Sequence, residues 1–212
     1  MFIEQPPWFY RLLFPGAIWK MPAPEKCVYL TFDDGPIPEM TPWVLDILDR
    51  YGIKATFFCV GDNVRKHPDV FRMVLERGHR VGNHTFNHIQ GWQYLTSNYM
   101  ANVEKADGYI GSPLFRPPHG HMRLAQVLKL RKRYKIVMWD VVTRDYSWRL
   151  TADEVFEVVK KYTRNGSVIV FHDSLKAEPR TRQALPRSLE WLLEQGYRFE
   201  LLDFPADTPE KR

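Results

Sequence analysis

Apolar runs that favour extended structure alternate along the chain with longer amphipathic stretches. The apolar runs predict strands at 27–32, 55–60, 79–82, 114–116, 135–139, 167–171 and 198–202. The amphipathic stretches predict helices near 41–52, 68–77, 98–110, 122–133, 152–162 and 181–195. About seven strands alternating with helices imply right-handed βαβ units and a parallel sheet, so the fold class is α/β. Both an irregular barrel of fewer than eight units and an open, doubly wound sheet satisfy this pattern.

The chain of 212 residues is long enough for a single domain with a substantial core. The proline-rich residues 1–25 predict an irregular N-terminal arm that packs on the barrel, residues 26–202 form the domain, and residues 203–212 form a polar tail. Hydrophobic residues make up 44% and charged residues 26% of the chain, which excludes a disordered chain and a coiled coil.

Charge and targeting signals are weak. The net charge is 30 − 25 = +5, which is too small to indicate a nucleic-acid partner. Neither a signal peptide nor a membrane-spanning apolar run is visible, so the sequence predicts a cytoplasmic protein, with association with the cell envelope as the alternative. Cys27 and Cys59 lie in apolar runs and are expected to be buried thiols.

Two segments leave a surface contact open. The aromatic run 8–14, beside Arg11 and Lys20, is expected to pack on its own domain, and the alternative is a peripheral contact with a lipid interface. The basic run 129–135 is expected to be a solvated helix face, and the alternative is docking to an anionic glycan or phospholipid headgroup. The sequence makes no prediction of the oligomeric state.

Polar residues with catalytic or metal-binding chemistry follow the predicted strands. They are Asp33, Asp34, His84, His88, Arg116, Asp140, Asp145, His172 and Asp173. Because the carboxyl ends of parallel strands meet at one edge of a sheet, we expect these side chains to form one site.

The pair His84 and His88 is the strongest metal-binding signal. Histidines at i and i+4 share a helical face and can bind one ion, whereas the alternative is two solvated loop histidines. A catalytic zinc site has three protein ligands, so a carboxylate must complete the set. Asp33 and Asp34 offer one carboxylate as ligand and one as base, unless the Asp-Asp-Gly-Pro segment serves only as a turn.

Two further segments supply candidate acid and oxyanion groups. His172 ends an apolar strand and is positioned to give a proton to a leaving group, with a helix-capping turn as the alternative. In the run 116–120, Arg116 can pair with a carboxylate in bidentate fashion, and the prolines can hold a following N–H towards an oxyanion. A plain surface turn is the alternative for this run.

Together these segments resemble the polysaccharide deacetylases, which are carbohydrate esterases of family 4 with a NodB-type domain. The resemblance covers about residues 26–202. It rests on five ordered motifs, Thr31-Phe32-Asp33-Asp34-Gly35-Pro36, His84-Thr85-Phe86-Asn87-His88, Arg116-Pro117-Pro118-His119-Gly120, the looser 139–146, and Val170-Phe171-His172-Asp173.

The resemblance implies a distorted (β/α) barrel with about seven parallel strands in a single domain. It assigns Asp34, His84 and His88 as ligands of one divalent ion, expected to be Zn²⁺, with Co²⁺ or Ni²⁺ as alternatives. It assigns the remaining roles in the same way, with Asp33 as base, His172 as acid, Asp145 orienting His172, and Arg116 tuning Asp33.

Two positions depart from the family pattern. His119 stands where the family more often has tyrosine, and Tyr146 replaces the usual tryptophan. We expect His119, Pro118 and Tyr146 to contact the oxyanion or the substrate.

The implied activity is hydrolysis of N-acetyl groups from amino sugars in a peptidoglycan or chitin-like glycan, which makes an acetylated amino-sugar glycan the expected partner. Trp92, Tyr94 and Trp148 are candidate stacking faces for sugar rings. The alternatives are a deacylase or deformylase of a small or lipid-linked amino sugar, and a non-catalytic carbohydrate-binding module.

Overall fold

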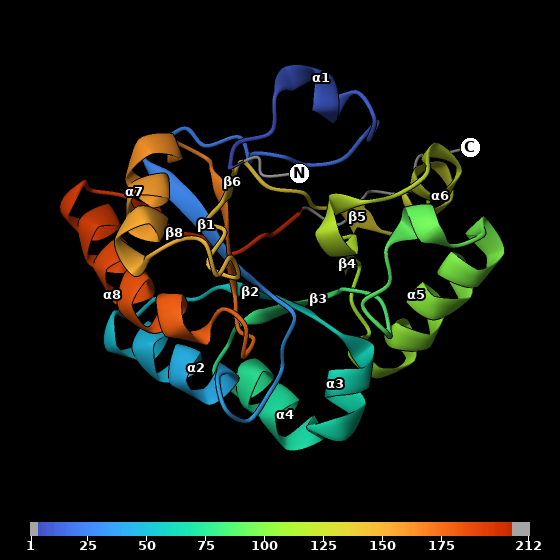
Figure 1. Ribbon diagram of the computed structural model, residues 1–212, viewed down its shortest axis with the longest axis horizontal. Coiled ribbons are helices and arrows are strands. Elements are labelled where there is room, and N and C mark those ends of the chain that lie inside the picture. Colours follow the sequence, from blue (N-terminus) through green and yellow to red (C-terminus); the bar gives the residue numbers. More distant parts are fainter. Residues whose placement is uncertain (1–3, 205–212) are drawn as a thin grey trace.

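A parallel sheet curls into an incomplete barrel in the computed structural model, which describes residues 4–204 (Figure 1). Its strands run in the order β5-β4-β3-β2-β1-β7-β6, and β8 pairs with β1. Their bounds are β1 Cys27–Asp33, β2 Thr56–Cys59, β3 Arg80–Asn83, β4 Leu114–Phe115, β5 Lys135–Ile136, β6 Val141–Val142, β7 Val168–His172 and β8 Arg198–Phe199. The predicted distorted barrel of about seven parallel strands is confirmed.

The central strands are buried on both faces, as their continuous apolar sequences require. All residues of β1 and of β7 are buried. Their register pairs Asp33 with His172, the last residue of each strand. The two polar side chains that end these apolar strands therefore emerge side by side.

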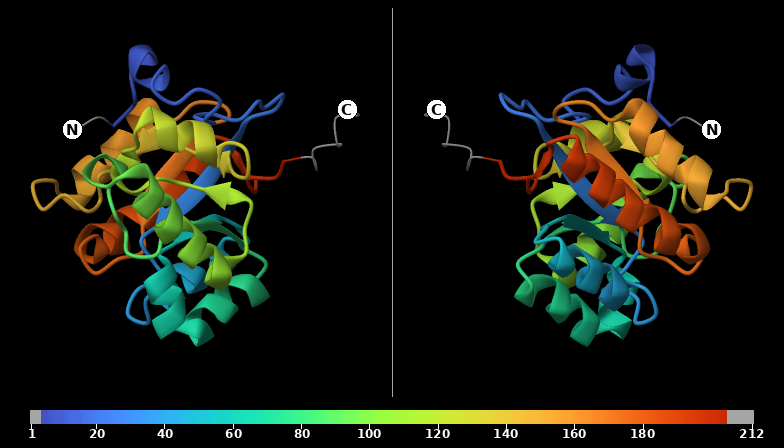
Figure 2. Two further views of the ribbon diagram at one scale, coloured as in Figure 1. Left: turned by 90° about the vertical axis from the view of Figure 1, so that its right-hand side faces the viewer. Right: turned by 90° about the vertical axis from the view of Figure 1, so that its left-hand side faces the viewer.

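The helices cover the outside of the sheet. Figure 2 shows α5 and α6 on one side and α2, α7 and α8 on the other. Their bounds are α1 Trp8–Arg11, α2 Thr41–Arg50, α3 Gly61–Lys66, α4 Pro68–Glu76, α5 Thr96–Ile110, α6 Leu124–Leu130, α7 Ala152–Tyr162 and α8 Glu178–Glu194. Each predicted strand and helix is present, with shifted ends. α1, α3 and β6 were not predicted, because they are too short to produce a clear periodic signal.

One segment joins the two edges of the sheet. β5 pairs with β4, and after the four intervening residues 137–140, β6 pairs with β7 in the same direction. The predicted strand 135–139 ends at Ile136 because the chain leaves β4 there before it reaches β7. The carbonyls of Val137 and Met138 accept hydrogen bonds from Arg116, at 3.1 and 2.9 Å, in place of a neighbouring strand.

The N-terminal arm runs beside this joining segment. Ile18 forms a parallel bridge with Val137, and Lys20 forms an antiparallel bridge with Ser167. At the other end of the arm, the carbonyl of Glu4 accepts a hydrogen bond of 2.8 Å from the Val142 backbone N–H. The arm is thereby attached to the barrel at both of its ends.

The aromatic run of the arm has two faces. Tyr10, Phe14 and Trp19 are buried in a cluster that includes side chains of β4, β5 and α6. The other face is exposed and consists of Trp8, Phe9, Leu12 and Leu13. Within residues 4–204, no helix is both long and apolar enough to span a bilayer.

Both cysteines are free and buried, as the sequence predicts. Burial, together with the nearby Asp173 and Asp33 carboxylates, raises the pKa of Cys59 well above its ordinary value. The thiol of Cys59 is therefore a packing group and not a nucleophile.

Candidate active site

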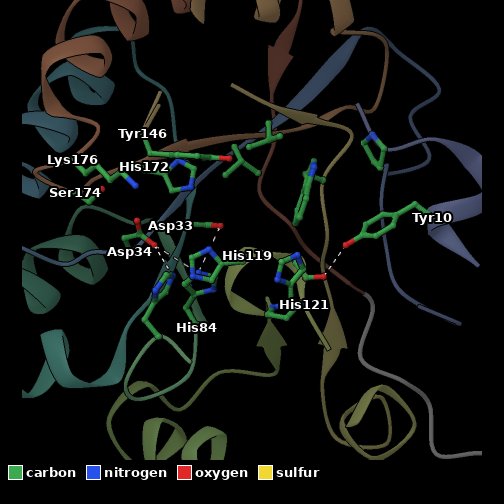
Figure 3. A pocket seen from close by; sticks show the side chains of 17 residues that line it. Tyr10, Asp33, Asp34, His84, His119, His121, Tyr146, His172, Ser174 and Lys176 are labelled. Carbon is green, nitrogen blue, oxygen red and sulfur yellow. Dashed lines mark hydrogen bonds and ion pairs between the residues drawn. The ribbon is translucent and has the colours of Figure 1, made fainter. Parts of the chain in front are cut away.

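Loops at the carboxyl edge of the sheet bring the predicted site residues together (Figure 3). Among the described residues, the non-glycine positions with positive φ all lie in these loops, and they are Asp34, Thr85, His88, His119 and Arg144. Such left-handed conformations are unfavourable for residues with a Cβ, and they concentrate where function dictates the backbone path. The strain therefore marks this edge as a functional site.

Asp34, His84 and His88 form a candidate metal centre. One donor atom from each residue lies within 4.8 Å of the others. The Asp34 Oδ1 atom is 3.1 Å from Nε2 of His88 and 3.8 Å from Nε2 of His84. Two imidazole nitrogens and a carboxylate oxygen are a donor set that suits a divalent transition metal.

The protonation states at this centre also fit a metal ion. Nδ1 of His84 lies 2.8 Å from the carbonyl oxygen of Arg116, so this nitrogen donates its hydrogen and leaves the Nε2 lone pair facing Asp34. Burial lowers the pKa of His84 to about 4, which keeps the ring neutral. Burial alone would raise the pKa of Asp34, but the hydrogen bond from His88 and the nearby histidines lower it below its ordinary value.

The two histidines reach the centre from a loop, and the prediction that they share a helical face is wrong. β3 ends at Asn83, and the following residues are irregular, with φ of 63° at Thr85 and 54° at His88. The Asn83 side chain accepts a 2.8 Å hydrogen bond from the Thr85 N–H, and Asn102 accepts hydrogen bonds from the next turn of the loop. Backbone reversal, and not helical periodicity, makes the imidazoles converge.

Asp33 lies beside the metal centre and pairs with a buried arginine. Its Oδ1 atom is 2.6 Å from Nη1 of Arg116, and its Oδ2 atom is 4.0 Å from Nε2 of His84. Arg116 is fully buried. Its Nη2 donates to the Met138 carbonyl, so the pairing with Asp33 uses one nitrogen and is not bidentate as expected. Oδ1 of Asp33 is thus held by the charge of Arg116, and Oδ2 of Asp33 faces the donor atoms of the candidate metal centre.

His172 is held by Asp145. Nδ1 of His172 lies 2.7 Å from Oδ1 of Asp145, while Oδ2 of Asp145 accepts 2.8 Å hydrogen bonds from the His172 backbone N–H and from Thr181 Oγ1. Nε2 is the ring nitrogen left to face the cleft. Burial opposes the charged ring, but the Asp145 carboxylate and the charges of Asp34 and Asp33 outweigh it and raise the pKa of His172 to about 9. His172 is therefore protonated at neutral pH.

Asp173 supports the loop that carries the two aspartates. Its carboxyl group accepts hydrogen bonds of 3.0 Å from the Gly35 N–H and 2.6 Å from Thr41 Oγ1. A Cβ on Gly35 would lie 2.0 Å from Oδ2 of Asp173, so the close approach requires glycine. Burial raises the pKa of Asp173 to about 7. The sequence left open that Asp33 and Asp34 serve only to form a turn. The turn is instead held largely by the side chain of Asp173.

The positions that depart from the family pattern border the same cleft. The His119 ring lies 4.8 Å from that of His88, between centroids, and φ at His119 is 57°. The Tyr146 ring meets His172 edge-on at 4.9 Å. Pro118 is buried in the 3-10 turn Pro118–Gly120, and Pro117 lines the cleft instead.

The cleft has a volume of about 560 Å³ and contains residues that the sequence analysis did not assign to the site. They are Pro6, Tyr10, His121, Trp139, Val142, Val170, Ser174 and Lys176. Tyr10 reaches it from the arm and donates a 3.0 Å hydrogen bond to the Gly120 carbonyl. His121 forms part of the cleft wall. Ser174 and Lys176 follow the His172 motif closely and could have been considered, whereas no local signal marks the arm residues.

Asp140 and the predicted stacking aromatics lie elsewhere. Asp140 is buried at the amino end of β7, where its carboxylate binds Arg164 at 2.6 and 2.8 Å and Arg11 at 3.1 Å. It precedes β6, so it is at the edge of the sheet opposite the site. None of the expected stacking residues Trp92, Tyr94 and Trp148 lines the cleft, although Trp92 stacks on His121 with ring centroids 4.1 Å apart.

Comparison with protein families and curated sequences gives concordant matches. A family model described as polysaccharide deacetylase matches residues 20–139. A peptidoglycan-N-acetylglucosamine deacetylase of Bacillus cereus is 35% identical over 189 residues, which cover 85% of this chain and 88% of that protein. A chitooligosaccharide deacetylase of Rhizobium leguminosarum bv. trifolii is 32% identical over 70% of this chain and 72% of its own length. In PgdA of Listeria monocytogenes, at 35% identity, the match spans 84% of this chain but 38% of that protein.

Solved structures share the fold. The Bc1960 peptidoglycan N-acetylglucosamine deacetylase superimposes with a TM-score of 0.85 at 29% identity, covering 93% of this chain and 95% of that chain. BA3943 of Bacillus anthracis, described as a pseudoenzyme of carbohydrate esterase family 4, has a TM-score of 0.76 at 25% identity, covering 89% and 68%. The fold is thus shared by active and inactive proteins, so the site residues must decide between them.

Proposed function

Because this chain belongs to the polysaccharide deacetylase family, we propose that it removes the N-acetyl group from amino sugars of a glycan, with a divalent ion held by Asp34, His84 and His88. The observation that carries the proposal is the meeting of these donors beside Asp33, whose Oδ2 atom faces them. The names of the relatives favour peptidoglycan or a chitin-like oligosaccharide as the substrate.

The donor set favours zinc. Three protein ligands of mixed nitrogen and oxygen type are typical of catalytic zinc sites, and Co²⁺ or Ni²⁺ can occupy the same arrangement. When bound, such an ion polarises the acyl carbonyl and lowers the pKa of a water molecule at the site.

Asp33 is the proposed general base. Its Oδ2 atom takes the proton from the attacking water as the water oxygen bonds to the carbonyl carbon. Arg116, 2.6 Å from Oδ1, holds the carboxylate in place. The backbone N–H of His119 is the proposed donor to the oxyanion, a contribution of about 10²–10³ in rate in other hydrolases.

His172 is the proposed general acid. Its raised pKa keeps Nε2 protonated, and Asp145 fixes the ring through Nδ1. When the carbon–nitrogen bond breaks, Nε2 gives its proton to the departing nitrogen, and the products are acetate and a free amine. Asp33 and His172, which end neighbouring strands, thereby divide the base and acid roles.

A non-catalytic binding module would not need this complete set. The ligands, the base with its arginine and the acid with its carboxylate partner are all present, and each group is held by its own partner. We therefore assign this chain to the catalytic members of the fold.

The test is release of free amine from N-acetylglucosamine oligomers and from peptidoglycan by metal-loaded protein. We expect turnover that a chelator abolishes and zinc restores. Asp33→Asn should retain bound metal and lose nearly all turnover, whereas the surface control Asp153→Asn, 79% exposed at its side chain, should behave as the parent. An active, metal-loaded Asp33→Asn protein would disprove the base assignment.

A further inference from the structure

The cleft extends well beyond the space that an acetyl group occupies. Its volume of about 560 Å³ compares with roughly 90 Å³ for the three non-hydrogen atoms of an acetyl group, taking each as about one water volume. Five of its lining residues, Pro6, Tyr10, Trp139, Val142 and Val170, form what we call the arm pocket. Tyr10 and Trp139 both approach Gly120, while Val142 pairs with Val170 and donates its N–H to the carbonyl of Glu4, two residues before Pro6. The five side chains are apolar apart from the hydroxyl and indole nitrogen, so the arm pocket suits a hydrocarbon group.

The arm makes this pocket and is fixed in place. The Glu4 backbone carbonyl accepts a hydrogen bond from Val142, and the Glu4 carboxylate pairs with Arg144. The Tyr10 hydroxyl donates to the Gly120 carbonyl at 3.0 Å, and Tyr10 is 6% exposed. Because the arm is attached to loops on both sides of the cleft, its inner face is a built wall of the site.

The position of the acid indicates which part of the substrate meets this wall. Figure 3 shows Ser174 and Lys176 on the same side of the metal centre as His172, and Tyr10 and His121 on the opposite side. His172 serves the departing nitrogen, so the sugar lies on its side, where the polar groups are. The substituent on the carbonyl carbon therefore points away from His172, towards the arm pocket.

We propose that the arm pocket binds an acyl chain longer than acetyl, so that the enzyme prefers amino sugars carrying a medium-length N-acyl group. This inference rests on the proposed function and specifies its substrate class. The reaction is unchanged: water adds to the acyl carbon, the carbon–nitrogen bond breaks, and the products are a fatty acid and a free amine. Each buried methylene group is expected to improve kcat/KM about fourfold until the pocket is filled.

The experiment compares chitobiose derivatives that carry N-acetyl, N-butanoyl or N-hexanoyl groups on zinc-loaded protein. Release of free amine gives kcat/KM, and butanoyl is expected to exceed acetyl by about 15-fold, from two methylene groups. Tyr10→Ala should reduce the butanoyl-to-acetyl ratio, and Tyr10→Phe, which retains the ring, should preserve it. The control Trp8→Ala, on the same helix but 75% exposed, should leave the ratio unchanged.

A binding measurement makes the result independent of turnover. With the Asp33→Asn protein, calorimetry should give tighter binding of the hexanoyl than of the acetyl derivative, and adding Tyr10→Ala should remove the difference. Equal or weaker binding of the longer chain, or a kcat/KM that falls with chain length, overturns the inference. Chain-dependent binding without turnover in the parent would instead contradict the proposed function and support the arm pocket.

Discussion

Asp145 sets the protonation of the proposed acid, and replacing it by asparagine tests that role. Asn is close in size to Asp, so packing is retained while the charge next to His172 is lost. The carboxylate holds Nδ1 at 2.7 Å, and its charge is the strongest of the attractions that offset burial and raise the pKa of His172 to about 9. Returning this pKa to its ordinary value of 6.5 corresponds to about 3 kcal/mol in favour of the neutral ring.

The sign of the effect follows from the role of the proton. An acid must be protonated to act, so activity is retained below its pKa and declines as the pH rises through it. In the metal-free parent His172 loses its proton near pH 9, and a bound ion lowers this point by the share that Asp34 contributes. In Asp145→Asn a pKa near 6.5 leaves about 3% of His172 protonated at pH 8, a loss of up to about 30-fold relative to the parent.

The assay is the pH profile of amine release between pH 5 and 10 on metal-loaded proteins. Asp34 also contributes to the raised pKa, and metal binding reduces that contribution equally in both proteins, so their difference isolates Asp145. Thr181→Val, which removes one 2.8 Å hydrogen bond to Asp145 and keeps the charge, is the matched control and should shift the limb far less. An alkaline limb that stays in place in Asp145→Asn would refute the reasoning.

Three further predictions concern the metal centre and the buried charges. His88→Ala should weaken zinc binding by at least about 10-fold in calorimetric titration, since one of three protein ligands is lost; unchanged affinity would exclude His88 as a ligand. Arg116→Met should cost about 3–5 kcal/mol in urea unfolding because it leaves the Asp33 carboxylate buried without its partner, and a loss below 1 kcal/mol would contradict this. Gly35→Ala should destabilise by roughly 1–3 kcal/mol, because its Cβ would meet the Asp173 carboxyl at 2.0 Å. Thermal unfolding at fixed metal concentration measures this loss, and a parent-like midpoint would show that Asp173 can move away.

The polar residues at the strand ends could be identified from the sequence, because the apolar strand and the polar residue that ends it are both local features. A buried strand has an apolar run that can be recognised from its own residues, and a polar residue at its end is conspicuous. Asp33 and His172 were found in this way, and the structure pairs them across β1 and β7. The family motifs added the division of roles between Asp33 and Asp34, which the residues alone left open.

Where the sequence analysis was wrong, the backbone path was decided by contacts outside the segment. The spacing of His84 and His88 fits a helix, but backbone hydrogen bonds donated to the side chains of Asn83 and Asn102 hold them in a loop with left-handed residues. Asp140 follows a predicted strand, but the chain crosses there to a two-residue strand beside β7, which places Asp140 at the opposite edge. Neither the loop that carries His84 and His88 nor the crossing at Asp140 produces a recognisable pattern in the neighbouring sequence.

From the sequence alone came the α/β class, the parallel strands and the residue types for hydrolysis, because hydrophobic periodicity and strand-end polarity are properties of short segments. Tertiary structure alone decided how the two edges of the incomplete barrel are connected, with the chain running from β5 to β6 and the arm attached to both sides of the cleft. It also decided that Tyr10 and Pro6 reach the cleft, more than a hundred residues away in the chain from His121 and Trp139 on the same wall. Contacts of this range depend on the packing of the whole chain, and no short stretch of sequence encodes them.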